Sequence, residues 1–225
     1  MLLQFSYTAA LLANLLNAED VTIWKDVPGV MNADPKEYDK AQVISKMSYK
    51  EAIELSHFGA KVIHTKNIKP IQNKQIPLYV RSFLHPESSG TIIEEIDEHL
   101  KLPPIYINKG NQCLLTLTPR DFSFIAEEKL SHIFAILAQY KLKLNLMQNS
   151  AISFSFCIDC NSAVFNDFLQ QLQEEFEVRY NQDVKLITIR HYTEDAIREI
   201  IGNRSSLVEQ RSRTTAQFVL RNHSI

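Results

Sequence analysis

The chain has 225 residues, of which 45% are hydrophobic and 22% are charged, as is ordinary for a globular protein. A formal net charge of -2 gives no basic field to recruit nucleic acid or an anionic membrane, and three cysteines do not predict a disulfide framework. We therefore expect a protein of a reducing, cytoplasmic setting with neither of those partners. The apolar stretch at residues 2–16 is interrupted by polar residues and has no basic residue before it. It predicts a buried helix, not a signal peptide.

Short helices and short apolar strands alternate in the first part of the chain. The pattern predicts helices at residues 7–17, 48–58 and 67–73, and strands at residues 21–24 and 77–83. This alternation is typical of an α/β layer.

The second of these helices has signals at both ends. Ser48 and Glu51 form the capping-box pattern, in which the glutamate side chain reaches back to the cap. Gly59 stands where a helix favours a left-handed stop. In the helix that follows, Pro70 is tolerable only if it falls in the first turn.

Turn residues separate this part of the chain from the next. Residues 85–104 open with proline, serine and glycine, continue through an acidic run and end on two prolines. We place a linker at residues 93–112.

A regular series of elements follows. The pattern predicts a strand at 114–117, a helix at 127–140, strands at 142–146 and 152–158, a helix at 164–172 and a strand at 184–190. In the second of these strands Leu142, Leu144 and Leu146 alternate with polar residues, which indicates a half-buried strand. The order βαββαβ predicts a ferredoxin-like arrangement. A shorter unit follows, with a helix near 194–200 and strands near 206–211 and 215–221, and reads as an incomplete second copy.

Three segments carry a family resemblance. Residues 23–36 read IWKDVPGVMNADPK, residues 47–52 read MSYKEA, and residues 58–64 read FGAKVIH. In this order and spacing they resemble the motifs of the aspartate kinases, and the likeness continues more weakly over nearly the whole chain. It implies the C-terminal half of such an enzyme.

The resemblance implies a fold and its boundaries. The expected fold is an α/β partial amino-acid-kinase lobe, followed by α+β ferredoxin-like domains of the ACT type, which bind amino acids and dimerise. The expected boundaries are 1–92 for the partial lobe, 93–112 for the linker, 113–190 for the first ACT-type domain and 184–225 for the second, incomplete or interleaved, possibly with residues 105–108.

The resemblance also implies nucleotide-binding residues. They are Lys25, Asp26, Met31, Lys36 and Lys61. Cations near the nucleotide fit the chemistry, because phosphoryl transfer requires charge to be spread over the moving oxygens. Without the resemblance, an aspartate beside proline and glycine is a turn former.

The start of the chain departs from the family pattern. Relatives reach the equivalent of Tyr7 through a glycine-rich run that ends in Gly-Ser-Asp, where this chain has Phe5 and Ser6 in the last two places. The family's opening Lys-Phe-Gly-Gly motif is absent. Phosphoryl transfer depends on positioning both reactants. We expect no intact catalytic site and no catalysis by this chain alone.

In the ACT-type region the resemblance implies effector contacts at Asn145, Asn149 and Ser150. These side chains offer donors and acceptors for the charged ends of an amino acid. The alternative is that they cap strand ends and form a turn. We expect lysine rather than threonine as the effector, and a homodimer formed through these domains.

A CxxC pair, Cys157 and Cys160, invites a metal or redox interpretation. Zinc normally needs four ligands, and no second pair or nearby histidines follow. We interpret Cys157 as a packed strand residue and expect no metal.

Three functions remain. The first is a regulatory fragment of aspartate kinase that retains amino-acid feedback sensing and dimerisation. The second is a subunit whose missing half comes from another chain, and the third is a structural dimerisation module. The parent reaction implied by the resemblance transfers phosphate from Mg-ATP to the side-chain carboxylate of aspartate, in lysine, threonine and methionine biosynthesis.

Overall fold

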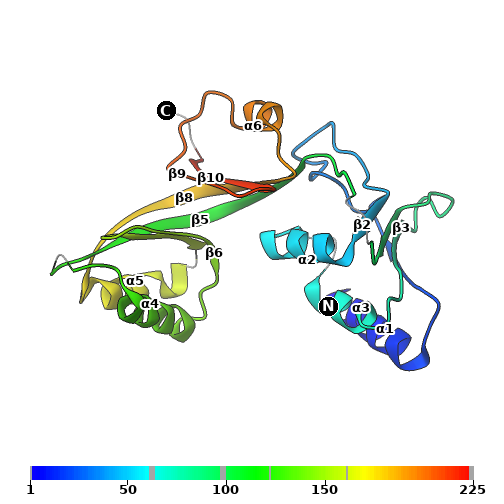
Figure 1. Cartoon of the computed structure of the whole chain (residues 1–225), viewed down its shortest axis with the longest axis horizontal. Coiled ribbons are helices and arrows are strands. Elements are labelled where there is room, and N and C mark those ends of the chain that lie inside the picture. Colours follow the sequence, from blue (N-terminus) through cyan, green and yellow to red (C-terminus); the bar gives the residue numbers. More distant parts are fainter. Residues whose placement is uncertain (1, 61–63, 97–99, 122, 161, 223–225) are drawn as a thin grey trace. The chain divides into compact units, whose positions relative to one another are not determined.

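The computed structural model describes residues 2–60, 64–96, 100–121, 123–160 and 162–222 (Figure 1). The chain divides into two compact units. The first unit comprises Met1–Ile107 and Ile189–Ile197, and the second comprises Asn108–Thr188 and Arg198–Ile225. Among the described residues, no helix has the length and apolar character needed to cross a membrane.

The first unit contains a four-stranded sheet in the order β1-β3-β4-β2. Its strands are β1 (Val21–Lys25), β2 (Lys46–Ser48), β3 (Leu78–Ser82) and β4 (Thr91–Glu94), and its helices are α1 (Leu2–Leu16), α2 (Tyr49–Phe58) and α3 (Thr65–Gln72). β1 runs parallel to β3, and β4 runs antiparallel to β3. Fully buried apolar side chains from both strands and helices, among them Met47, Ile68 and Val80, form one core. The expected alternation of helices and strands is confirmed. The expected burial of α1 is wrong, because Leu12, Leu15 and Leu16 are 51%, 73% and 76% exposed.

The ends of α2 follow the expected signals. The Ser48 hydroxyl accepts a hydrogen bond from the backbone N–H of Glu51 at 3.1 Å, and Gly59 adopts the left-handed conformation with a φ of 115°. The reciprocal half of the capping box was predicted wrongly, because the Glu51 carboxylate binds Arg190 instead of reaching back to the cap.

α3 begins earlier than expected. His64 is its N-cap, and its Nδ1 accepts a hydrogen bond from the N–H of Lys66 at 3.1 Å. Pro70 is therefore the sixth residue of the helix and not part of its first turn, which corrects the prediction. Proline lacks an N–H, so it removes one bond of the helical ladder, and the helix ends two residues later.

The second unit is built on a six-stranded sheet in the order β6-β7-β5-β8-β10-β9. Its strands are β5 (Ile105–Pro119), β6 (Leu144–Asn149), β7 (Phe154–Asp159), β8 (Phe176–Arg190), β9 (Val208–Arg211) and β10 (Thr215–Arg221), and the helices of this part of the chain are α4 (Glu127–Gln139), α5 (Ser162–Gln173) and α6 (Glu194–Ile201). α4 and α5 cover one face of the sheet (Figure 1).

Two long strands begin earlier than predicted. β5 starts at Ile105, within the segment expected to be a linker. Its first residues are held in place because the side chains of Ile105 and Ile107 are buried in the core of the first unit. β8 starts at Phe176, eight residues before the expected strand. Its first five residues, FEVRY, alternate apolar and polar side chains, a strand signal that the prediction missed because the polar residues 181–183 separate it from the apolar run at 184–190.

Alternation along β5 separates two apolar clusters. Cys113, Leu115 and Leu117 face α4 and α5, whereas Leu114 lies on the other face with Cys157. Successive side chains of a strand point to opposite faces, so residues adjacent in sequence belong to different clusters.

Candidate functional site

A β-bulge places Asn145 in the second unit. Leu144 pairs with Ile158 while Leu146 pairs with Cys157, so Asn145 is the extra residue between two consecutive pairs. The bulge also sends the neighbouring leucines to opposite faces, Leu144 toward α4 and α5 and Leu146 away from them. The simple alternation expected for this strand is therefore wrong at this point.

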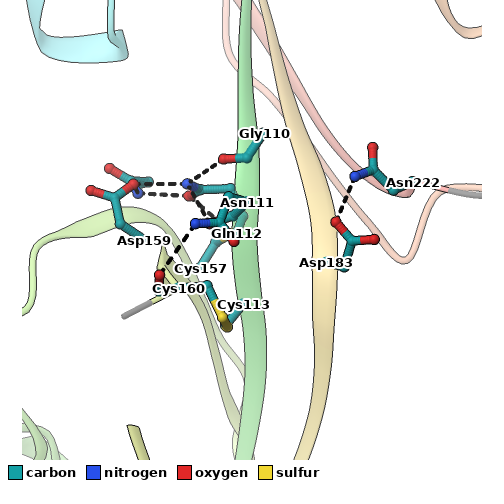
Figure 2. The surroundings of a disulfide bond; sticks show 10 residues. Gly110, Asn111, Gln112, Cys113, Cys157, Asp159, Cys160, Asp183 and Asn222 are labelled. Carbon is teal, nitrogen blue, oxygen red and sulfur yellow. Dashed lines mark hydrogen bonds between the residues drawn. A yellow bond between two sulfur atoms is a disulfide. The ribbon is translucent and has the colours of Figure 1, made fainter. Parts of the chain in front are cut away.

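Asn145 lies in a polar cluster with three other side chains, Lys109, Gln112 and Asp159. Its Oδ1 accepts a hydrogen bond from Lys109 Nζ at 2.7 Å, and its Nδ2 donates to Gln112 Oε1 at 2.7 Å and to Asp159 Oδ1 at 2.9 Å. Gln112 Nε2 also donates to Asp159 Oδ1, at 2.7 Å (Figure 2). These four residues, the Asn145 cluster, combine one cation, one anion and two amides on three adjacent strands.

The other three residues of the Asn145 cluster stabilise the ionised form of Asp159. Burial acts to raise the pKa of Asp159, but the hydrogen bond from Gln112, the charge of Lys109 and the hydrogen bond from Asn145 outweigh it and hold the pKa below its ordinary value. Lys109 Nζ lies 3.6 Å from Asp159 Oδ1. The cluster therefore presents a carboxylate, exposed over 60% of its side chain, beside an ammonium group.

A disulfide joins Cys113 and Cys160 on the opposite face of the same strands (Figure 2). Their Cα atoms are 5.2 Å apart, within the range that a disulfide spans. The expectation drawn from the low cysteine count is thereby corrected. The two residues are 47 positions apart in sequence, and they meet because Cys113 pairs with Ile158 in the antiparallel ladder, which puts Cys160 diagonally beside it.

The third cysteine, Cys157, is a buried free thiol. Burial, together with the charge of Asp159, raises its pKa to about 12 against the opposing effect of Lys109. The thiol therefore remains protonated at neutral pH and is a poor nucleophile.

Asn149 and Ser150 lie at the other end of β6 from Asn145. Asn149 pairs with Phe154, and Ser150 donates its N–H to the carbonyl of Ser153 at 2.8 Å, closing the turn to β7. Asn149 is four positions after Asn145 along the strand, a distance of about 13 Å. The structure thus does not bring the three expected effector residues to one point of this chain.

The loop after β1, residues 26–44, is held by one buried threonine. Thr91 Oγ1 accepts a hydrogen bond from the N–H of Val30 at 2.8 Å and donates to the carbonyl of Ile44 at 2.6 Å. A Cβ added at Gly29 would lie 2.6 Å from that oxygen, so the close approach of the loop requires glycine.

The expected nucleotide residues lie on this loop and at the end of β1. Lys25 is the last residue of β1, opposite Ser82 of the parallel strand β3, and burial lowers the pKa of Lys25 against the charge of Asp26. Met31 is half-buried and bridges to the other arm of the loop, and the Lys36 side chain is exposed. Lys61 lies outside the described residues. The carboxyl ends of parallel strands are where α/β sheets bind ligands.

Asn32 organises the same loop through contacts at both ends of its side-chain amide. It is 7% exposed, its Oδ1 accepts from the N–H of Gln42 at 2.7 Å, and its Nδ2 donates to the carbonyl of Pro104 at 3.2 Å. Its position in the Gly-Val-Met-Asn-Ala-Asp-Pro run was visible, but its distant partners were not.

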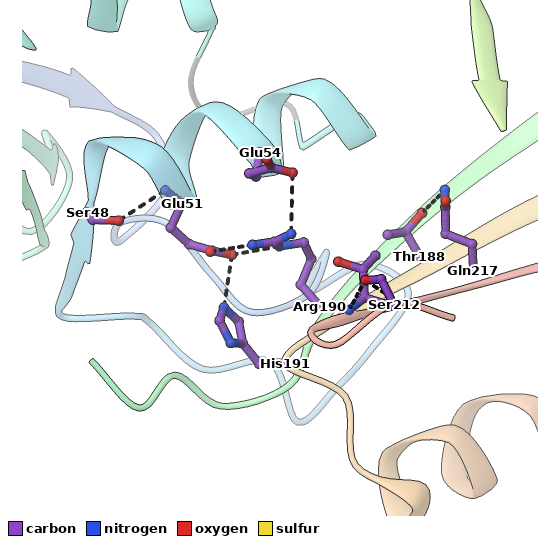
Figure 3. Close-up of polar contacts among 9 residues, drawn as sticks. Ser48, Glu51, Glu54, Thr188, Arg190, His191, Ser212 and Gln217 are labelled. Carbon is purple, nitrogen blue, oxygen red and sulfur yellow. Dashed lines mark hydrogen bonds and ion pairs between the residues drawn. The ribbon is translucent and has the colours of Figure 1, made fainter. Parts of the chain in front are cut away.

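A buried ion pair belongs to the first unit. Arg190 Nη2 lies 2.6 Å from Glu51 Oε2 and Arg190 Nε donates to Glu51 Oε1 at 2.9 Å, a two-bond contact between side chains only 10% and 9% exposed (Figure 3). Arg190 Nη1 also lies 3.3 Å from Glu54 Oε2, and His191 Nε2 lies 3.2 Å from Glu51 Oε1. The His191 nitrogen is not aligned for a hydrogen bond, so its contact with Glu51 is ionic when the imidazole is protonated.

We expect stability to fall in acid because of Glu51. Burial acts to raise its pKa, but the contacts with His191 and Arg190 outweigh burial and lower the pKa from 4.5 to about 2. Because the pKa of Glu51 is lower in the folded protein than in the unfolded chain, the ionised carboxylate stabilises the fold fully above pH 4.5. This stabilisation is lost as the pH falls toward 2. The loss is about 3 kcal/mol, at about 1.4 kcal/mol for each pKa unit. Urea denaturation at successive pH values measures it.

The control for this experiment is Glu51→Gln, which removes the titrating group. Its stability should depend less steeply on pH in this range, whereas Glu177→Gln, at a half-exposed position, should keep the wild-type dependence. Equal slopes for all three proteins would contradict the assignment to Glu51.

The described residues contain no group of three or more histidine, cysteine, aspartate or glutamate side chains placed to hold a metal ion.

Comparisons with known proteins give one consistent family. A model of the amino acid kinase family matches residues 4–82. The lysine-sensitive aspartokinase 3 of Escherichia coli (strain K12) is 36% identical over 157 residues, covering 68% of this chain and 34% of that protein. The chloroplastic aspartokinase 1 of Arabidopsis thaliana is 27% identical over 209 residues, covering 91% of this chain and 36% of that protein.

A solved structure agrees with these relatives. The crystal structure of E. coli aspartokinase III in complex with aspartate and ADP matches with a TM-score of 0.80 and 26% identity, over 96% of this chain and 52% of that one. The chain thus spans about a third of the length of the two curated relatives and about half of the solved one.

Proposed function

This chain belongs to the aspartokinase family, and from that premise we propose that it is the part of an aspartokinase that senses an amino-acid effector. Lysine is the proposed effector, because the E. coli relative is described as lysine-sensitive. The whole protein is proposed to transfer phosphate from Mg-ATP to aspartate. Lys25, Asp26, Met31, Lys36 and Lys61 are proposed to contact the nucleotide, which is supported by the ADP bound to the E. coli structure.

The Asn145 cluster is the observation that carries the sensing proposal. A free amino acid has a carboxylate and an ammonium group, and the cluster offers a cation, an anion and amides within one hydrogen-bonded group. A bulge is a common way to aim a side chain at a ligand. Effector contacts by Asn149 and Ser150 are proposed separately, because they lie at the far end of β6 and not in the Asn145 cluster.

The domain type is part of the proposal. We infer a ferredoxin-like, ACT-type domain in the second unit, supported by the strand order β6-β7-β5-β8 and by two helices on one face. The domain boundaries stated above, 93–112 for the linker and 113–190 and 184–225 for the two ACT-type units, remain proposals.

Isothermal titration of the purified chain with lysine, then threonine, then Mg-ATP tests the proposal. We expect saturable heat with lysine and a roughly tenfold or greater loss of affinity in Asn145→Ala, because a hydrogen bond to a charged group contributes about 1.5–3 kcal/mol. Ser150→Ala tests the far end of β6 separately: a loss of affinity in this variant would show that lysine is also contacted there.

The matched control is Asn166→Ala, an exposed asparagine on α5 that should leave lysine binding unchanged. Absence of heat with both amino acids would contradict sensing by this chain. The structural dimerisation module, the third of the functions considered, would then be favoured by the exposed apolar side chains of Phe124 and Ile152, 70% and 55% exposed, and sedimentation of the same samples would test it.

A further inference from the structure

The disulfide and the Asn145 cluster lie back to back on the same two strands. Cys113 follows Gln112 on β5, and Cys160 follows Asp159 at the end of β7. Gln112 pairs with Asp159 in the ladder, and their side chains hydrogen-bond on one face while the two sulfur atoms meet on the other. A change in the spacing of the strands at this point therefore acts on both.

The backbone at Cys160 is joined by two hydrogen bonds to Asn111, two residues before Cys113. Its N–H donates to the carbonyl of Asn111 at 2.9 Å, and Asn111 Nδ2 donates back to the carbonyl of Cys160 at 3.3 Å. Asn111 has a φ of 52°, a left-handed conformation that costs energy for a residue other than glycine. The disulfide helps to hold this junction closed.

We propose that Cys113 and Cys160 form a reversible redox modification site, which accepts a low-molecular-weight disulfide as oxidant and sets the geometry of the Asn145 cluster. The two thiols differ in access, because Cys113 is fully buried and Cys160 is half-buried. Cys160 is therefore the sulfur that a small reagent reaches first. The remaining thiol, Cys157, is buried on the other face with a raised pKa and takes no part.

The small disulfide is reduced to two thiols as the two cysteine thiols are oxidised to a disulfide. The Cys160 thiolate attacks one sulfur of the small disulfide, forming a mixed disulfide and releasing one small thiolate. The Cys113 thiolate then attacks the Cys160 sulfur and releases the second. Two protons and two electrons leave the protein, and one disulfide becomes two thiols. A small thiol in excess reverses both steps, again through Cys160.

Equilibration of the full chain in glutathione buffers of graded ratio, followed by denaturing alkylation and peptide mass mapping, tests the modification. We expect Cys113 and Cys160 to gain and lose protection from alkylation together, with Cys157 alkylated at every ratio. Two free thiols in excess oxidised glutathione, or a pair still closed in excess reduced glutathione, would overturn the proposal.

The side-chain amide resonances of Asn145 and Gln112 test the coupling to the cluster. We expect both to shift when the wild-type protein is reduced, and Cys160→Ser to give the reduced spectrum under all conditions. Cys157→Ser, which keeps a donor toward Gln112, should respond like the wild type. Identical spectra of the oxidised and reduced wild type would overturn the coupling without relying on any variant.

Neither readout depends on amino-acid binding. A consequence for lysine affinity would rest on the proposed function, so failure of the redox site and failure of sensing would be seen in separate experiments.

Discussion

Replacing Arg190 with alanine is expected to lower the free energy of unfolding by about 3–5 kcal/mol, because it leaves the Glu51 carboxylate buried without its guanidinium partner. Glu51 is 9% exposed, so water replaces few of the lost bonds. Urea denaturation followed through the fluorescence of Trp24, the only tryptophan in the sequence, reports on the first unit.

A matched arginine on the same strand separates burial from charge. Arg179 pairs with Glu177 at 2.9 Å, but these side chains are 81% and 55% exposed. Exposed pairs contribute little, so Arg179→Ala should change stability by less than about 1 kcal/mol. The double variant Glu51→Gln with Arg190→Met should be more stable than Arg190→Ala, since it leaves no unpaired charge. A loss in the double variant as large as in Arg190→Ala would contradict this account.

Reduction of the Cys113–Cys160 disulfide is expected to lower the free energy of unfolding of the second unit by about 4 kcal/mol. The bond closes a loop of 47 residues, and a cross-link of this span removes about that much conformational freedom from the unfolded chain. Denaturation followed by far-ultraviolet circular dichroism, with and without dithiothreitol, measures the change.

Cys160→Ser should reproduce the effect of reduction and should no longer respond to dithiothreitol. The unfolding of the first unit, followed through Trp24, should be unchanged in both cases, because both cysteines belong to the second unit. Equal stability of the oxidised and reduced proteins would show that the cross-link does not constrain the chain as the loop length implies.

The sequence predicted correctly those features of the fold that depend only on residues close together in the chain. The cap at Ser48, the stop at Gly59 and the helix expected at residues 127–140 each depend on residues within a few positions, and each is confirmed. The motifs of residues 23–36 and 58–64 predicted the family for the same reason, since they are local strings of residues.

Features that depend on distant partners were missed. The partner of Glu51 lies 139 residues away, and the partner of Cys113 lies 47 residues away. The bulge at Asn145 has no marker of its own, because its polar side chain fits simple alternation equally well. Only the pairing with β7, which starts nine residues later, determines that Leu144 and Leu146 point to opposite faces.

The path of the chain affects how the protein can be divided. The chain leaves the first unit after Ile107, returns at Ile189 and leaves again after Ile197. A fragment that stops at residue 107 would keep Glu51 but lose Arg190. No single cut therefore yields both units whole, and expression of the first unit alone would require residues 189–197 to be joined to residue 107 through a short artificial connection.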